Sequence, residues 1–367
     1  MTNIKNKLVS DMLFLYSEET AIIHTNHGRN PNDPSKLNNA YPITFGDIET
    51  IGKYDNKHFK EELLVEDDSF KFIFFLELTF YHFLLDILMQ ILVAKSVYSN
   101  ATIILDIAGA VPDFDKSLLK TESLKREDVR LLPLGQYKEK ILNYIDLIEQ
   151  LQKNNIKYIL IDSHTQYLKA NKIHVTQTFP VGMTYNSINL LSKNLIENNV
   201  LDKNIVKDKK IYLSRRHMKS LADESTNPDS RVRSIINYFF RDHNARIDNE
   251  IILENFLKDN FGFEIIIPEV EFTKGLTEQI EYFSKAKIIM SLTSSGLTNQ
   301  LFADSNCTII ELLTPINSNK EEGYHCQYSQ MSHYLKKRYI SIPHNRSVND
   351  IINAISSNKY IQKVLES

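Results

Sequence analysis

The sequence has few cysteines, no excess of basic residues and no long uncharged apolar segment. Cys307 and Cys326 are the two cysteines among 367 residues. This excludes a disulfide framework and a thiolate-rich metal site, and it favours a reducing compartment. Lys and Arg number 43 against 46 Asp and Glu, which gives a net charge of -3 and excludes a general nucleic-acid binder. The most apolar segment, residues 70–97, contains charged residues such as Lys71 and Glu77, so no run reaches the roughly 20 uncharged residues of a membrane span.

Residues 1–18 lack the basic start, apolar stretch and small-residue cleavage site of a secretory signal. We therefore expect a cytoplasmic protein. The length of 367 residues exceeds the roughly 250 to 300 residues that one hydrophobic core serves. This length therefore predicts two domains. Because 42% of the residues are hydrophobic, global disorder is excluded.

Strands and helices alternate along the chain, which predicts parallel sheets and an α/β fold in both halves. Residues 1–60 give no confident element. The expected strands are 70–76, 101–107, 158–161, 210–213, 263–267, 288–292 and 308–313. The expected helices are 81–98, 137–152, 249–258 (with Asp248 as N-cap and Gly262 as its stop), 276–286, 297–304 and 348–365.

A polar stretch rich in Asn, Asp and Lys, residues 201–210, is the expected link between the domains. The predicted domains are residues 1–190 and 205–345. Residues 346–367 form a C-terminal helix, and its packing back on the N-terminal domain is a hypothesis.

Small and hydroxyl-bearing residues follow the expected strand 288–292. They are Thr293, Ser294, Ser295 and Gly296, and a helix is expected to begin at Leu297. In open parallel sheets ligands bind beyond the carboxyl ends of strands, and free N–H groups at a helix start favour an anion such as a diphosphate. An ordinary N-capped turn explains the same residues.

Two arginines, Arg215 and Arg216, follow the expected strand 210–213. A guanidinium is planar, permanently charged and able to donate two parallel hydrogen bonds, which suits phosphate. If the two strand ends are neighbours in one sheet, the arginines and the residues before Leu297 face the same crevice and form a nucleotide diphosphate site. The alternative is surface arginines in solvent or in ion pairs.

A histidine and an aspartate in the first half are candidates for acid–base chemistry. His82 and Asp86 are four residues apart and share a helix face, so the carboxylate can hold the imidazole as a general base. A core histidine beside a surface acid explains the pair equally. Asp162 and His164 follow another expected strand and are further candidates.

Several signatures of cofactor and metal sites are missing from the sequence. It has no GxGxxG after a strand, no Walker loop and no HExxH. The spacing of His325, Cys326 and His333 fits no standard zinc site, so these residues are expected to be structural. No metal site and no cofactor are therefore predicted.

The second half resembles glycosyltransferase family 61 in several motifs that occur in the same order. The motifs lie at residues 210–216 (KIYLSRR), 246–250 (RIDNE), 262–269 (GFEIIIPE), 278–279 (EQ), 295–299 (SGLTN), 301–303 (LFA) and 309–312 (IIEL). In the first half, Tyr81-His82-Phe83-Leu84 followed by Asp86 is similar to a weaker N-terminal motif of that family.

The resemblance implies a GT-B architecture, with two Rossmann-like parallel-sheet domains facing across a cleft. It implies an inverting, metal-independent hexosyl- or pentosyltransferase that moves a sugar from a nucleotide diphosphate sugar, expected to be a UDP-sugar, to a hydroxyl of a glycan, glycolipid or protein. The implied donor-binding residues are Arg215, Arg216, Thr293, Ser294, Ser295, Gly296, Leu297, Thr298, Asn299 and Glu311, the last near the ribose. His82 or Asp86 is the candidate base.

One departure from the family pattern leaves other functions open. The family usually has His-Gly-Ala where this chain has Thr293, Ser294 and Ser295, so no imidazolium stabilises charge there. A non-catalytic relative that binds nucleotide sugars or glycans is one alternative. A sugar-nucleotide epimerase on the same scaffold is another.

Overall fold

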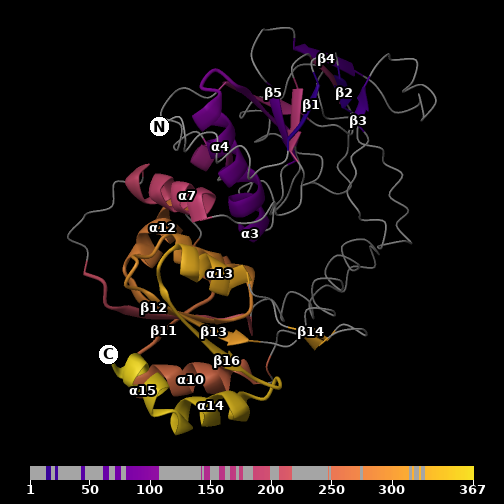
Figure 1. Cartoon of the computed structure of the whole chain (residues 1–367). Coiled ribbons are helices and arrows are strands. Elements are labelled where there is room, and N and C mark those ends of the chain that lie inside the picture. Colours follow the sequence, from indigo (N-terminus) through magenta and orange to yellow (C-terminus); the bar gives the residue numbers. More distant parts are fainter. Residues whose placement is uncertain are drawn as a thin grey trace. The chain divides into compact units, whose positions relative to one another are not determined.

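The computed structural model contains the helices and strands labelled in Figure 1. The chain divides into two compact units, Met1–Leu191 and Ser192–Ser367, which we describe separately. The structure describes residues 14–17, 21–23, 43–45, 61–65, 71–75, 80–106, 142, 144–148, 157–161, 166–170, 173–176, 185–198, 206–216, 247, 249–272, 276–313, 316–317, 322–323 and 327–367. Among the helices of these ranges, none is long and apolar enough to cross a membrane.

The first unit contains two sheets. One has the strand order β1-β9-β5-β6-β7 and is parallel except at β1–β9, and the other has the order β3-β2-β8-β4 and is mixed. The strands are β1 (Phe14–Ser17), β2 (Ala21–Ile23), β3 (Ile43–Phe45), β4 (Glu61–Val65), β5 (Lys71–Phe75), β6 (Thr102–Asp106), β7 (Lys157–Ile161), β8 (Gln166–Ala170) and β9 (Ile173–Thr176). The expected parallel strands 70–76, 101–107 and 158–161 are confirmed within one or two residues. The antiparallel pairs and the second sheet were not predicted.

The helical segment after β5 changes its winding along its length. It runs through α3 (Phe80–His82), six π-helical residues in η2 (Phe83–Leu88) and α4 (Met89–Val97), where one continuous helix was expected. Among its described apolar residues, Phe83, Leu84 and Ile91 are fully buried. Residues 142 and 144–148, which lie inside the expected helix 137–152, are helical. The helix α7 (Tyr185–Asn198) contains the boundary between the units.

The second unit is built on one five-stranded parallel sheet with the order β11-β10-β12-β13-β16. Its strands are β10 (Lys209–Leu213), β11 (Glu264–Ile266), β12 (Ala286–Leu292), β13 (Thr308–Leu313) and β16 (Arg338–Pro343). Two short strands, β14 (Ile316–Asn317) and β15 (Glu322–Gly323), form a separate antiparallel pair. Four strands of the large sheet were predicted from their branched apolar residues, and β16 was not.

Helices cover both faces of this sheet (Figure 1). On one face lie α12 (Leu276–Ser284) and α13 (Gln327–Tyr334), and on the other lie α10 (Glu250–Phe261), α14 (Val348–Ser357) and α15 (Lys359–Glu366). The chain also forms the short helix α11 (Pro268–Glu271) and the 3-10 helix η5 (Ser295–Leu301). Gly262 ends α10 as predicted, with a left-handed φ of 72°, whereas the N-cap is Asn249 rather than Asp248.

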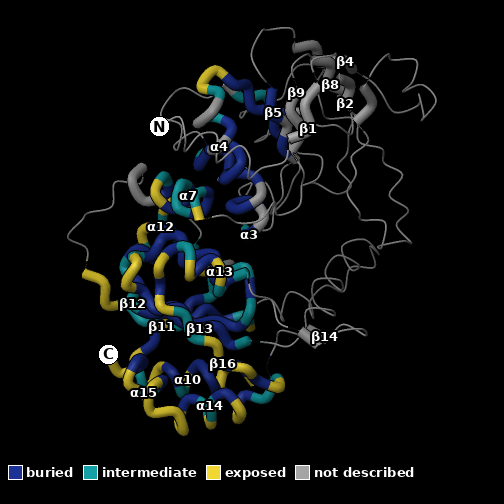
Figure 2. The backbone as a smooth tube through the Cα atoms, viewed as in Figure 1, coloured by how far each residue is buried: buried dark blue, intermediate teal, exposed yellow. Residues whose placement is uncertain are grey.

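The C-terminal residues form two helices where one was expected. Ile351 and Ile355 of α14 and Ile361 and Leu365 of α15 belong to the same buried cluster as Met290 of β12. Figure 2 shows their inner sides buried and their outer sides exposed. The apolar faces of both helices are therefore buried within the second unit, and packing of residues 346–367 on the N-terminal domain stays a hypothesis.

Candidate functional site

The carboxyl ends of β10, β12 and β13 are neighbours at one edge of the parallel sheet. Leu213 of β10 pairs in register with Ser291 of β12, and Ser291 pairs with Glu311 of β13. The residues predicted to bind the donor therefore follow or end adjacent strands. We call residues 214–216 the arginine turn and residues 293–296 the serine turn.

The serine turn packs directly against the last residue before the arginine turn. The Ser291 hydroxyl donates to the carbonyl oxygen of Leu213 at 3.2 Å and lies 3.2 Å from Ser294 Oγ. A Cβ added to Gly296 would lie 3.1 Å from Leu213 Cδ1 and 3.3 Å from Ser294 Oγ. Glycine thus permits the close approach of the serine turn to Leu213, the residue that precedes the arginine turn.

Two acidic side chains of α10 contact the arginine turn. Glu250 Oε1 accepts hydrogen bonds from the backbone N–H of Arg215 and from the Tyr212 hydroxyl, both at 2.9 Å. Glu254 lies one helical turn later, and its Oε1 accepts from Ser214 Oγ at 2.7 Å and pairs with Arg216 Nε at 3.1 Å. Sequence reasoning missed both partners.

Burial changes the acid–base properties of this region. It raises the pKa of the Glu250 carboxyl, and the hydrogen bonds from Arg215 and Tyr212 oppose that rise. Burial, followed by the charge of Glu250, raises the pKa of the Tyr212 hydroxyl well above its usual value. Tyr212 therefore keeps its proton and remains a donor to the carboxylate.

Glu311 of β13 accepts hydrogen bonds from two protein hydroxyl groups. Thr293 Oγ1 donates to Glu311 Oε1 at 2.7 Å, and the Tyr339 hydroxyl donates to Oε2 at 2.6 Å. Glu311 has no exposed surface, and burial raises its pKa against these two hydrogen bonds. The contacts fix the Thr293 side chain, while the expected ribose contact of Glu311 stays a prediction.

Three of the predicted donor-binding residues of η5 are buried. Leu297, Thr298 and Asn299 have no exposed surface. Asn299 Nδ2 donates to Gly296 O at 2.8 Å, and Gln279 Nε2 donates to Asn299 Oδ1 at 2.6 Å. Within the described ranges, Thr298 Oγ1 is the buried side-chain oxygen or nitrogen without a hydrogen-bond partner.

Solvent can reach other parts of the two turns. Arg215, Thr293, Ser295 and Gly296 are partly exposed, and Arg216 is exposed. In this conformation a ligand can therefore meet the arginine turn and the outer residues of the serine turn, whereas Leu297, Thr298 and Asn299 shape the turn from inside.

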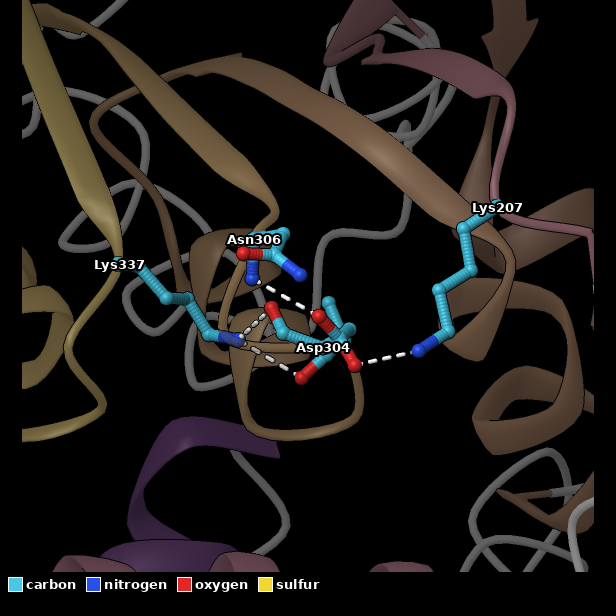
Figure 3. Close-up of polar contacts among 5 residues, drawn as sticks. Lys207, Asp304, Asn306 and Lys337 are labelled. Carbon is cyan, nitrogen blue, oxygen red and sulfur yellow. Dashed lines mark hydrogen bonds and ion pairs between the residues drawn. The ribbon is translucent and has the colours of Figure 1, made fainter. Parts of the chain in front are cut away.

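A buried lysine stabilises the far end of η5 (Figure 3). Lys337 Nζ donates to the carbonyl oxygens of Ala303 at 2.7 Å and Asp304 at 2.5 Å. Asp304 also forms an ion pair with Lys207 and accepts from the N–H of Asn306. Burial lowers the pKa of Lys337 to about 8. No sequence pattern marked this lysine, because its partners lie more than 30 positions earlier in the chain.

The candidate base residues belong to the helical segment of the first unit. His82 ends α3, and Asp86 lies within the π-helical residues of η2, a winding often found at functional sites. Their side chains, together with Asp162, His164, His325 and Cys326, lie outside the described residues. His333 is exposed on α13. In the described part of the chain, no group of three or more His, Cys, Asp or Glu residues could hold a metal ion.

Comparison with known proteins gives one family. The model of the family described as Glycosyltransferase 61 matches residues 80–310, well over half of the chain. No curated protein matches the chain. The matched region contains the helical segment with His82, the arginine turn and the serine turn, and membership supports glycosyl transfer as the activity. The chain belongs to the glycosyltransferase 61 family.

Proposed function

We propose that the protein is an inverting, metal-independent glycosyltransferase that uses a nucleotide diphosphate sugar, with a UDP-sugar as the first candidate. The acceptor is a hydroxyl of a glycan, glycolipid or protein. The observation that carries the proposal is the position of both turns at the carboxyl edge of one parallel sheet, where Gly296 of the serine turn lies against Leu213, the residue before the arginine turn. In such sheets this edge is where ligands bind.

Positive charge and hydroxyl donors in these turns suit the diphosphate leaving group. Arg215 and Arg216 supply the guanidinium groups, and Thr293 and Ser295 supply partly exposed hydroxyls. Negative charge develops on the diphosphate oxygen as its bond to the anomeric carbon breaks, so pre-positioned donors stabilise the transition state more than the ground state. A metal-independent mechanism, in which side chains rather than a metal ion carry this role, is part of the proposal.

The acceptor side of the proposal belongs to the first unit. The acceptor oxygen attacks the anomeric carbon, the bond to the diphosphate breaks with its electron pair, and the acceptor proton passes to His82 or Asp86. The direct displacement inverts the anomeric centre. The proposal includes the GT-B arrangement, in which a donor domain and an acceptor domain face each other across a cleft.

Binding and turnover are tested with a panel of nucleoside diphosphates and their sugars. We expect one nucleoside diphosphate to bind by calorimetry, and its sugar to release that diphosphate in the presence of a suitable acceptor and of EDTA. The double variant Arg215→Ala/Arg216→Ala should weaken binding at least about a hundredfold, because it removes two charged donors. Lys285→Ala, which removes a partly exposed lysine paired with Glu281, is the matched control.

Three results separate the possible functions. Unchanged affinity in the double variant would refute the assignment of the arginines. Binding without turnover across the panel would favour a non-catalytic relative, and a changed sugar without acceptor would favour an epimerase. If no nucleoside diphosphate or nucleotide sugar binds, the proposed donor class is wrong.

A further inference from the structure

Glu254 links the backbone and the side chain of Arg216 to one buried carboxylate oxygen. Its Oε1 accepts from Ser214 Oγ at 2.7 Å and pairs with Arg216 Nε at 3.1 Å. The Ser214 hydroxyl in turn accepts from the backbone N–H of Arg216 at 3.3 Å. One anion on α10 therefore fixes both where the arginine turn lies and how its guanidinium is oriented.

The pair has a buried partner and an exposed one. The Glu254 side chain is 4% exposed, whereas the Arg216 side chain is 44% exposed. A guanidinium has five N–H donors, and Nε uses one of them. The contact through Nε leaves the Nη groups for an incoming anion, so the ion pair does not consume the paired donors that suit a phosphate.

We propose that Glu254 is a positioning residue for donor binding, which holds the Arg216 guanidinium in the orientation that receives the diphosphate. This inference rests on the proposed function. Glu254 does not touch the donor itself and acts through Arg216 and Ser214. Glu250 complements it, because its hydrogen bond to the N–H of Arg215 fixes the preceding residue of the turn.

A simple charge effect predicts the opposite result of mutation. A carboxylate beside a guanidinium reduces the local positive potential, so its removal alone would strengthen diphosphate binding. A positioning role requires the length and the acceptor oxygen of the side chain rather than its charge. Two conservative variants separate these explanations.

The test measures the dissociation constant of the nucleoside diphosphate that binds the wild-type protein, chosen from UDP, ADP, GDP and CDP by calorimetry. Glu254→Gln keeps the length and an acceptor oxygen, so we expect its affinity within about threefold of wild type. Glu254→Asp keeps the charge but is one methylene shorter, so we expect about tenfold weaker binding, the scale of one lost hydrogen bond to a charged group. Glu264→Ala is the control, since it removes another carboxylate of the second unit, which lies at the start of β11 and pairs with Lys209.

A second measurement shows whether Glu254 acts through Arg216. In an Arg216→Ala background, Glu254→Asp should weaken binding no further, because the side chain that it positions is absent. The inference is overturned if Glu254→Asp binds the nucleotide like wild type, whether or not Glu254→Gln binds it more tightly. It is also overturned if the effects of Glu254→Asp and Arg216→Ala on the binding free energy are additive. In each of these outcomes the wild-type protein still binds a nucleoside diphosphate. If the wild-type protein bound none of the four nucleoside diphosphates, the proposed function itself would be refuted.

Discussion

The buried ammonium of Lys337 predicts that the protein becomes more stable between about pH 7 and pH 9. Burial lowers the pKa of this lysine from 10.5 to about 8 in the folded protein. Between these values the unfolded chain binds more protons than the folded one, so the free energy of unfolding rises with pH. The gain from about pH 7 to pH 9 is about 1.3 kcal/mol, because the folded lysine loses its proton first and the cost of burying the charge disappears.

The variant Lys337→Met isolates this effect. Methionine has a similar length and no charge, so the variant avoids a burial cost of about 3 kcal/mol at pH 7. It also leaves the carbonyl oxygens of Ala303 and Asp304 without their donor, at about 1 to 3 kcal/mol each. These terms nearly cancel at pH 7, and we expect the variant to be less stable than wild type by more than about 1 kcal/mol at pH 9.

Urea unfolding of both proteins at the two pH values measures the difference. The raised pKa of the buried Cys307 thiol, about 12, lowers stability in the same range because the unfolded thiol ionises first. It is present in both proteins and largely cancels in the subtraction. If wild-type stability does not rise relative to Lys337→Met between the two pH values, the reasoning from burial is wrong.

Two further substitutions test the interior of the site. Thr298→Val should leave the free energy of unfolding unchanged or raise it, because the buried hydroxyl has no partner in the described part of the chain and costs energy there. A loss above about 1 kcal/mol in urea unfolding, or weaker nucleotide binding, would show that the hydroxyl has a partner. Gly296→Ala should cost about 1 kcal/mol and weaken nucleotide binding, since its Cβ would press on Leu213 Cδ1 at 3.1 Å. Calorimetry and urea unfolding that both match wild type would mean that the two turns have room to separate.

The strands of the second unit could be predicted because their signal is local. Residues 308–313 are predicted and found as β13, and β12 and β10 differ from prediction by only one or two residues at their starts. Most residues of β12 and β13 are apolar and buried on both faces of the sheet, as are Ile211 and Leu213 of β10. The end of α10 at Gly262 could also be predicted, because a glycine after a helix commonly adopts the left-handed conformation that ends the helix.

The contacts that shape the site could not be predicted in the same way. Glu250 and Glu254 were placed on a helix, but their partners in the arginine turn lie 35 to 40 positions earlier. The pairing of Tyr339 with Glu311 spans 28 positions. Such partners depend on how helices and strands pack, which apolar periodicity does not specify.

The first unit shows the same limit for strands. β1 has only four residues, and it pairs with β9 about 160 positions later, where Phe14 meets Thr176. A short segment whose pairing partner is so distant has little local signal. In the second unit, the helix expected at residues 297–304 is the 3-10 helix η5, which begins two residues earlier, at Ser295. The last two residues of the serine turn therefore belong to this helix.

The strand order of the second unit has a consequence for biosynthesis. β16 is the last strand of its sheet to leave the ribosome, and it covers the open side of β13. Until β16 is synthesised, β13 is an edge strand whose apolar residues and unpaired amide and carbonyl groups are exposed. Such an edge can pair with strands of other molecules. Premature termination between β13 and β16 would therefore yield a fragment prone to self-association rather than a smaller soluble domain.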